Sequence, residues 1–173
     1  MFEGWDNYFV MTGTASAGLI GLLFVVVTLT SNFERERALR GSAIYLTPTM
    51  THFAVVLTAS AIVLAPRLPP ALTASLLGGA GVVGLGNAVR TAVGILELGK
   101  GADPPHWTDL WCYAVLPGAV YVGLEGAVAG LMAGGGWAPG AVAALLLATL
   151  LIAIRNAWDL ITWMAPQGAK PPG

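Results

Sequence analysis

Charged residues are scarce in this chain of 173 residues. Asp, Glu, Lys and Arg make up 10% of the sequence, whereas they make up about a quarter of an ordinary soluble domain. Four long stretches contain none of them: residues 7–33, 41–66, 68–89 and 126–154. An apolar stretch of roughly 18 or more residues is long enough to cross a hydrocarbon core about 30 Å thick. A soluble fold would need several buried helices and almost no surface, which a chain this small cannot supply.

Other features are also missing. Cys112 is the single cysteine, so an intramolecular disulfide framework is excluded. The net charge of −1 provides no basic face, so we expect no nucleic-acid partner. The N-terminal MFEGWDNYF lacks the basic region and cleavage site of a signal peptide, so we expect the first span to be retained. No Ser-His-Asp order, nucleophile elbow or phosphate loop occurs, which favours a protein that is not an enzyme.

Clusters of proline and glycine divide the apolar sequence, as they do between helices. The pattern predicts an all-α, polytopic integral membrane protein: one transmembrane domain over residues 1–173, with spans at about 8–30, 45–65, 72–96, 110–133 and 138–163. The second and third spans, and the fourth and fifth, are joined so closely that they should form antiparallel hairpins. Four spans remain an alternative if one hairpin is re-entrant. Pro117 should bend the fourth span near its beginning.

The distribution of Lys and Arg between the loops predicts the orientation. Arg67 is the only basic residue on one side, which also holds the acidic N-terminus. The other side holds Arg35, Arg37, Arg40, Lys100 and Lys170. The positive-inside rule therefore predicts an outer N-terminus, a cytoplasmic C-terminus and an odd number of spans, which agrees with five.

Three spans carry small residues four positions apart, which allows two helix backbones to approach closely. The rows are Gly13, Ala17 and Gly21; Ala80, Gly84, Ala88 and Ala92; and Gly126, Gly130 and Gly134. Three rows exceed what five helices need for internal packing, so we expect a homo-oligomer in the lipid bilayer. The alternative is a compact monomer whose rows reflect only a composition rich in Gly and Ala.

Glu125 is the most deeply placed charged residue, in the middle of the fourth span with no charged neighbour on that helix. A charge at the centre of a span is costly, by about 2.5–3.5 kcal/mol on insertion scales. The carboxyl could serve as a proton or cation site. The alternative is a protonated Glu that forms a hydrogen bond with another helix or subunit.

A polar stripe lies on the third span, where Asn87, Arg90 and Glu97 share one helical face. Arg90 lies roughly 10 Å of helix deeper than Glu97. His52, early in the second span, belongs to the same cytoplasmic layer. These residues predict a polar vestibule on the cytoplasmic side.

The fifth span carries a second stripe of Arg155, Asn156 and Asp159, at a depth like that of the first. We expect the two stripes to share the vestibule. The alternative is that Trp158 and Trp163 form an aromatic belt, with Asp159 at the membrane interface and Arg155 extending towards it.

Metal binding is not favoured by the sequence, and we expect no cofactor. The residues that could act as ligands show no spacing such as HxxxH or CxxC: His52, His106, Cys112, Asp103 and Asp109. A haem held by the two histidines is an alternative, but a histidine beside prolines in a loop is more often a surface residue.

Two segments carry a resemblance to known sequences. GTASAGLIGLLFVVVTL (13–29) resembles the first helix of a loose group of small, uncharacterised bacterial membrane proteins, and RNAWDLITW (155–163) is similar to their last helix. The resemblance implies a multi-pass protein of a bacterial inner membrane and implies no activity. From the residues themselves we expect an oligomeric channel or small transporter, with anions favoured by the intramembrane arginines. The alternative is a non-transporting scaffold or accessory subunit of a larger membrane complex.

Overall fold

The computed structural model describes residues 1–30, 42–101 and 105–164 of the chain, and the side chains of 1–28, 44–101 and 105–162. Arg35, Arg37, Arg40, Asp103 and Lys170 lie outside these residues, as does the side chain of Trp163. The long helices are α1 (Asp6–Thr30), α3 (Thr47–Leu64), α4 (Pro70–Leu98), α6 (Leu116–Met132) and α7 (Ala138–Met164). Three short segments lead into them: the π-helical η1 (Ser42–Leu46) and η2 (Trp111–Val115), and α5 (Trp107–Leu110).

Within the described residues, five helices are long and apolar enough to cross a membrane. The prediction of an all-α chain with five such helices is therefore confirmed. Membrane insertion and its orientation stay predictions.

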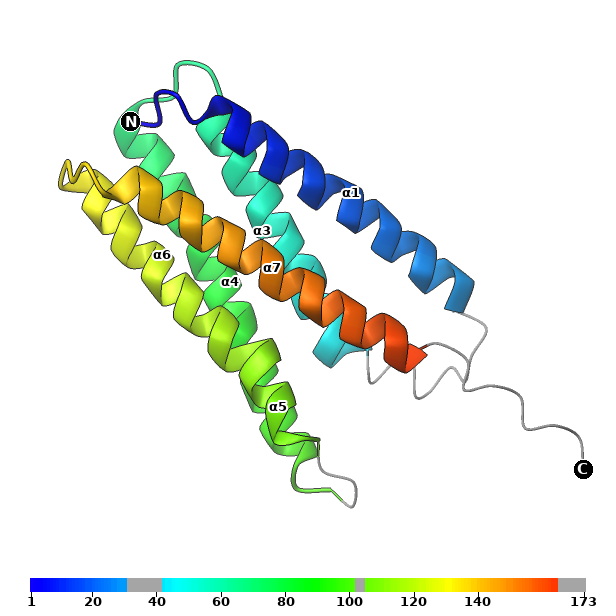
Figure 1. Cartoon of the computed structure of the whole chain (residues 1–173). Helices are drawn as coiled ribbons and strands as arrows, with labels where there is room; N and C mark the ends of the chain where they lie inside the picture. The colour runs from blue at the N-terminus through cyan, green and yellow to red at the C-terminus, as the bar shows by residue number, and fades with distance from the viewer. Residues whose placement is uncertain (31–41, 102–104, 165–173) are drawn as a thin grey trace, which may run out of the picture.

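Neighbouring helices in the sequence run antiparallel (Figure 1). Figure 1 shows α7 between α1 and α6, and α7 packs on both of them and on α3. α4 packs on α3 and α6. We call the end where α1 and α7 begin the N-terminal end of the bundle, and the end where α1, α4 and α7 finish the C-terminal end.

Small polar side chains join α1 to its neighbours. The hydroxyls of Thr12 and Ser60 lie 3.2 Å apart, and the hydroxyl of Ser16 donates to the carbonyl of Phe53 at 2.6 Å. Tyr8 donates to the carbonyl of Ala143 on α7 at 2.6 Å. Such bonds hold helices together where lipid supplies little hydrophobic drive.

α4 and α6 approach each other along what we call the glycine groove, formed by Gly78, Gly81 and Gly84 of α4. A Cβ atom at Gly84 would overlap the ring of Tyr121, and one at Gly81 would overlap the carboxyl of Glu125. Tyr121 and Glu125 are four residues apart on α6, so they lie on one face and enter successive positions of the groove. Glycine at these positions therefore brings a tyrosine and a carboxyl group against the α4 backbone.

The predicted rows of small residues divide between internal contacts and exposed surface. Gly13 packs on Ser60, and Gly84 on Tyr121. Ala17, Gly21 and Gly126 are exposed. In the same row as Gly126, Trp137 covers Gly130, and Gly134 has a φ of +74° in the turn before α7. The first and third rows are therefore used only in part inside the chain, whereas Gly84 and Ala88 of the second row are buried.

Prolines accompany both π-helical segments. Pro48 and Pro117 each lie in the first turn of the α-helix that follows η1 or η2. A proline ring clashes with the carbonyl four residues earlier and removes one N–H donor. A wider turn just before each proline relieves this clash, so the distortion expected at Pro117 takes the form of a π turn in η2.

Exposed tryptophans lie at both ends of the bundle. Trp137 is 62% exposed at the N-terminal end, and Trp107 and Trp158 are 68% and 70% exposed at the C-terminal end. Tryptophans are enriched where membrane helices meet the two lipid–water interfaces. Their positions fit helices that span a bilayer along the full length of the bundle.

Candidate functional site

The predicted site residues lie in three places. A terminal network at the C-terminal end contains Tyr45, Asp109, Tyr113, Arg155, Asn156 and Asp159. A groove between η1, α3 and α4 is lined by Ile44, Thr47, Arg90, Thr91 and Gly94. A core polar line between α3, α4 and α6 contains His52, Asn87, Tyr121 and Glu125.

Asn156 is the buried centre of the terminal network, with 0% of its surface exposed. Its side-chain oxygen accepts from Arg155 at 3.1 Å, and its Nδ2 donates to the carbonyl of Cys112 at 3.0 Å. In η2, the N–H of Leu116 donates to the carbonyl of Trp111. The next bond of this kind would run from the N–H of residue 117 to the carbonyl of Cys112, but Pro117 has no N–H. Asn156 therefore supplies the donor that the proline cannot.

Tyr113 connects α7 to η2. Its hydroxyl lies 3.1 Å from the carbonyl of Asn156 and 3.1 Å from the carboxylate of Asp159, so both accept from it. Asp159 also lies 3.9 Å from Arg155, and both side chains of this pair are about half exposed. The polar groups of the predicted fifth-span stripe thus bind one another and the adjoining helix.

Tyr45 extends the terminal network to η1. Its ring packs edge to face on that of Tyr113, with centroids 5.0 Å apart, and its hydroxyl donates to Asp109 at 3.2 Å. Sequence reasoning missed both tyrosines. The available signal was a tyrosine within an apolar span, because a buried hydroxyl requires a hydrogen-bond partner.

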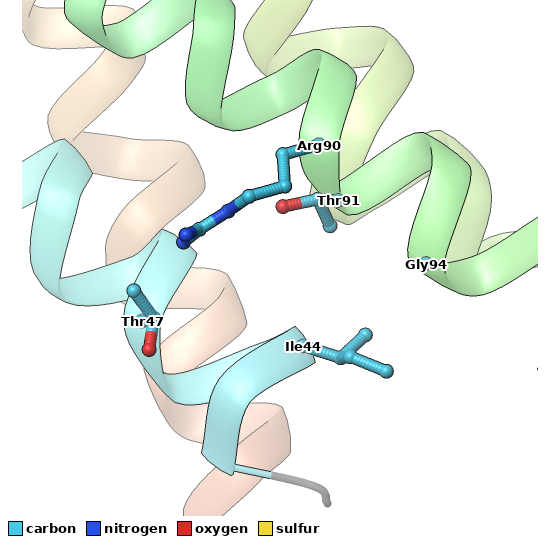
Figure 2. A pocket seen from close by; sticks show the side chains of 5 residues that line it. All are labelled: Ile44, Thr47, Arg90, Thr91 and Gly94. Carbon is cyan, nitrogen blue, oxygen red and sulfur yellow. The ribbon is translucent and has the colours of Figure 1, made fainter.

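Arg90 lies in the groove, a hollow of about 290 Å³ open to the outside of the bundle. Its guanidinium points across the groove towards α3 (Figure 2). Nη2 donates to Oδ1 of Asn87 at 3.3 Å. Glu97, at the end of α4, is exposed, and no hydrogen bond or ion pair joins its carboxylate to another described residue. The groove therefore contains a cation whose remaining N–H donors have no hydrogen-bond partner among the described side chains, apart from Asn87.

The two predicted stripes lie at the same end of the bundle, on different sides of η1. Ile44 of η1 lines the groove with Arg90, whereas the next residue, Tyr45, belongs to the terminal network. Over the described part of the chain, no hydrogen bond or ion pair joins Arg90 to Arg155, Asn156 or Asp159. The layer is shared, but the polar groups form two separate sets.

His52 lies in the core rather than along the groove, and it is 0% exposed. Its Nδ1 and the hydroxyl of Tyr121 are 2.7 Å apart and form a hydrogen bond. Three buried polar atoms have no hydrogen-bond partner among the described residues: His52 Nε2, Asn87 Nδ2 and Glu125 Oε1. The core polar line therefore keeps unused hydrogen-bonding capacity on three helices.

The two histidines among the candidate metal ligands are far apart. His106 is exposed, and its Nδ1 accepts from the N–H of Thr108 at the start of α5. His52 is bound to Tyr121, which lies roughly 22 Å of helix from His106. The two histidines therefore cannot ligate one haem.

No protein-family model, curated protein or solved structure matches this chain. The resemblance of the first and last spans to small bacterial membrane proteins stays a prediction.

Proposed function

We propose that the protein is an oligomeric membrane channel or small transporter that accepts anions at the Arg90 groove. The supporting observation is the placement of Arg90: its guanidinium points across an open hollow of about 290 Å³, and α4 is apolar enough to be one of the candidate membrane spans. An arginine at such depth is costly unless it faces protein, water or a charged partner.

The surroundings of Arg90 suit an anion. Asn87 holds one N–H of the guanidinium, which fixes its direction and leaves other N–H donors for a ligand. Gly94 supplies no side chain, so the hollow stays open one turn from Arg90. Arginine binds carboxylate and phosphate groups through paired hydrogen bonds, so anions with planar or tetrahedral oxygen groups fit best. The groove would be the cytoplasmic entrance in a bacterial inner membrane.

The test is anion flux in liposomes that contain purified wild type or Arg90→Ala. Arg67→Gly is the control, because it removes an arginine from the turn at the opposite end and leaves a residue that tolerates the φ of 62° there. We expect Arg90→Ala to abolish flux and Arg67→Gly to retain it. Equal flux in the wild type and Arg90→Ala, or none in any sample, would contradict the proposal.

The oligomeric state depends on surfaces that the single chain leaves open. Gly18 and Gly21 of α1 and Gly126 of α6 have no other part of the described chain within reach of a Cβ atom. In the proposed oligomer these positions contact neighbouring copies. Gly21→Leu should then lower the oligomer mass measured in detergent, without changing the fold of the monomer.

A second candidate is a scaffold or accessory subunit of a larger membrane complex. It is favoured by the terminal network, in which Arg155, Asn156 and Asp159 bind one another and the adjoining helix. In this function the exposed glycines would dock a different protein. Purification from native membranes separates the candidates, because a stoichiometric partner supports the scaffold and a symmetric homo-oligomer supports the channel.

A further inference from the structure

The unpartnered atoms of the core polar line come from three neighbouring helices. His52 belongs to α3, Asn87 to α4 and Glu125 to α6, and these helices pack on one another in the pairs α3–α4 and α4–α6. A buried polar group without a partner costs roughly 1–3 kcal/mol. His52 binds Tyr121, and Glu125 lies one turn from Tyr121 on α6, so two of these atoms belong to residues next to one tyrosine. Unpartnered polar groups at this position indicate a place that water or a proton can enter, because apolar side chains would otherwise fill it.

Glycine positions the carboxyl of Glu125. The side chain lies against Gly81, and its second oxygen is 3.4 Å from where a Cβ atom of Gly78 would stand. Tyr121 occupies the next position of the glycine groove, at Gly84, and forms the hydrogen bond to His52. Tyr121 and Glu125 are thus roughly 6 Å apart along the axis of α6, a gap that one water molecule can bridge.

We infer that Glu125 is a site of reversible proton binding, supplied from the C-terminal end of the bundle through His52 and Tyr121. In this path a hydronium ion that penetrates the bundle from that side gives its proton to the buried Nε2 of His52 and leaves water, and the Nδ1 proton passes to the oxygen of Tyr121. The hydroxyl proton of Tyr121 then moves through a bridging water to the carboxylate of Glu125. One O–H bond forms at Glu125, while His52 changes tautomer and both His52 and Tyr121 end neutral.

Among the residues that the structure describes, none around Glu125 carries a charge that would hold the carboxyl permanently in one state. On α6 its neighbour is Tyr121, and on α3 the nearest titratable group is His52. α4 faces it with glycine, and Arg90 is the nearest charged residue of that helix. α7, which also packs on α6, has no charged residue from 138 to 154. The carboxyl can therefore change its protonation without breaking an ion pair.

The first test uses a hydrophobic carbodiimide, which modifies protonated carboxyl groups in apolar surroundings, and locates the product by mass spectrometry. We expect modification at Glu125 that is strong in acidic buffer and lost in alkaline buffer. Glu97, exposed at the end of α4, is the internal control. Labelling of Glu125 to the same extent at acidic and alkaline pH would overturn the inference, and so would labelling of Glu97 alone.

A matched pair of variants keeps the carboxyl itself in place. Gly81→Ala puts a methyl group where the Glu125 carboxyl lies, whereas a Cβ atom at Gly79 meets nothing within 4 Å. We expect Gly81→Ala to change the pH at which labelling is lost and Gly79→Ala to leave it unchanged. Identical pH profiles for the two variants would overturn the inference.

The path to Glu125 is tested by measuring proton uptake into liposomes that contain the protein. This proton path does not depend on the proposed function; only a coupling between proton uptake and anion flux would rest on it. Tyr121→Phe removes the hydroxyl that binds His52 and should abolish uptake, whereas Tyr113→Phe, in the terminal network, should not. Uptake that survives Tyr121→Phe would overturn the path. Proton uptake without anion flux would refute the proposed function and leave the proton site standing.

Discussion

The terminal network and the core polar line use similar side chains in different ways. In the terminal network, Asn156 forms bonds through both ends of its amide, and Tyr113 has two acceptors. In the core polar line, Asn87 has an unpartnered Nδ2 and His52 an unpartnered Nε2. Polar residues of a membrane helix can thus either join helices or remain available for a ligand, and residue type alone does not separate the two.

The difference arises from whether a backbone carbonyl near each set lacks a hydrogen-bond donor. The terminal network surrounds a backbone carbonyl that lacks a donor because of Pro117, so its amide and hydroxyl groups have structural partners. The core polar line lies near the glycine groove of α4, and α4 is an α-helix whose carbonyls bond within the helix. Side chains there receive no backbone partner, which leaves His52 Nε2 and Glu125 Oε1 free for water or protons.

The largest effect is expected where the core polar line is most tightly packed. Gly84→Ala places a methyl group within the ring of Tyr121, which is buried and bound to His52. Overpacking of this kind should lower the free energy of unfolding by about 3 kcal/mol. Gly86→Ala, where a Cβ atom meets nothing within 4 Å, should change it by less than about 0.5 kcal/mol. Denaturation in detergent measures both, and equal values would show that the glycine groove is loosely packed.

A smaller loss is expected in the terminal network. Asn156→Leu leaves the carbonyl of Cys112 without its donor, which should lower the free energy of unfolding by about 2 kcal/mol. The same change in a Pro117→Ala background should cost less, because alanine restores an N–H near that carbonyl. A double-mutant cycle measures the coupling. Additive effects would separate Asn156 from the proline and weaken the structural interpretation of this network.

The smallest effect is expected at the exposed edge of the same network. Asp159→Asn removes the charge opposite Arg155 and keeps an oxygen that Tyr113 can donate to. The pair is 3.9 Å apart and about half exposed, so the change should cost less than about 1 kcal/mol. Thermal unfolding at low and high salt measures it. A larger, salt-dependent loss would show that the network depends on charge rather than on hydrogen bonds.

The sequence was sufficient to predict the five long helices and their hairpins, because lipid requires long apolar stretches and proline and glycine interrupt them. Arg90 and Arg155 both lie towards the C-terminal ends of their helices, as counting residues along a helix predicts, and their shared membrane layer stays a prediction. The direction in which a side chain points around the helix was harder to obtain. The row Ala80, Gly84, Ala88 and Ala92 included Gly84, which packs on Tyr121, and Ala88, which is buried. It did not include Gly78 and Gly81, because the glycine groove follows a spacing of three rather than four.

The partners of the polar residues could not be predicted from a single helix. Asn156 bonds to Cys112, 44 positions away, and His52 to Tyr121, 69 positions away. Such pairs depend on the rotation of each helix about its axis, which the π turns before Pro48 and Pro117 change locally. Tyrosine was also overlooked because it carries no charge at neutral pH, although tyrosine hydroxyls form hydrogen bonds in both the terminal network and the core polar line.

The π turn of η2 bears on any insertion or deletion in this part of the chain. A π turn contains about one residue more than an α turn, and each residue of an α-helix advances the rotation by about 100°. Loss of one residue between Trp111 and Val115 would therefore restore regular α geometry and swing the preceding α5 around the axis. Asp109 would then face away from Tyr45, and η1 would lose this hydrogen bond to the fourth span. Homologous chains that lack the proline are accordingly expected to be one residue shorter at this point.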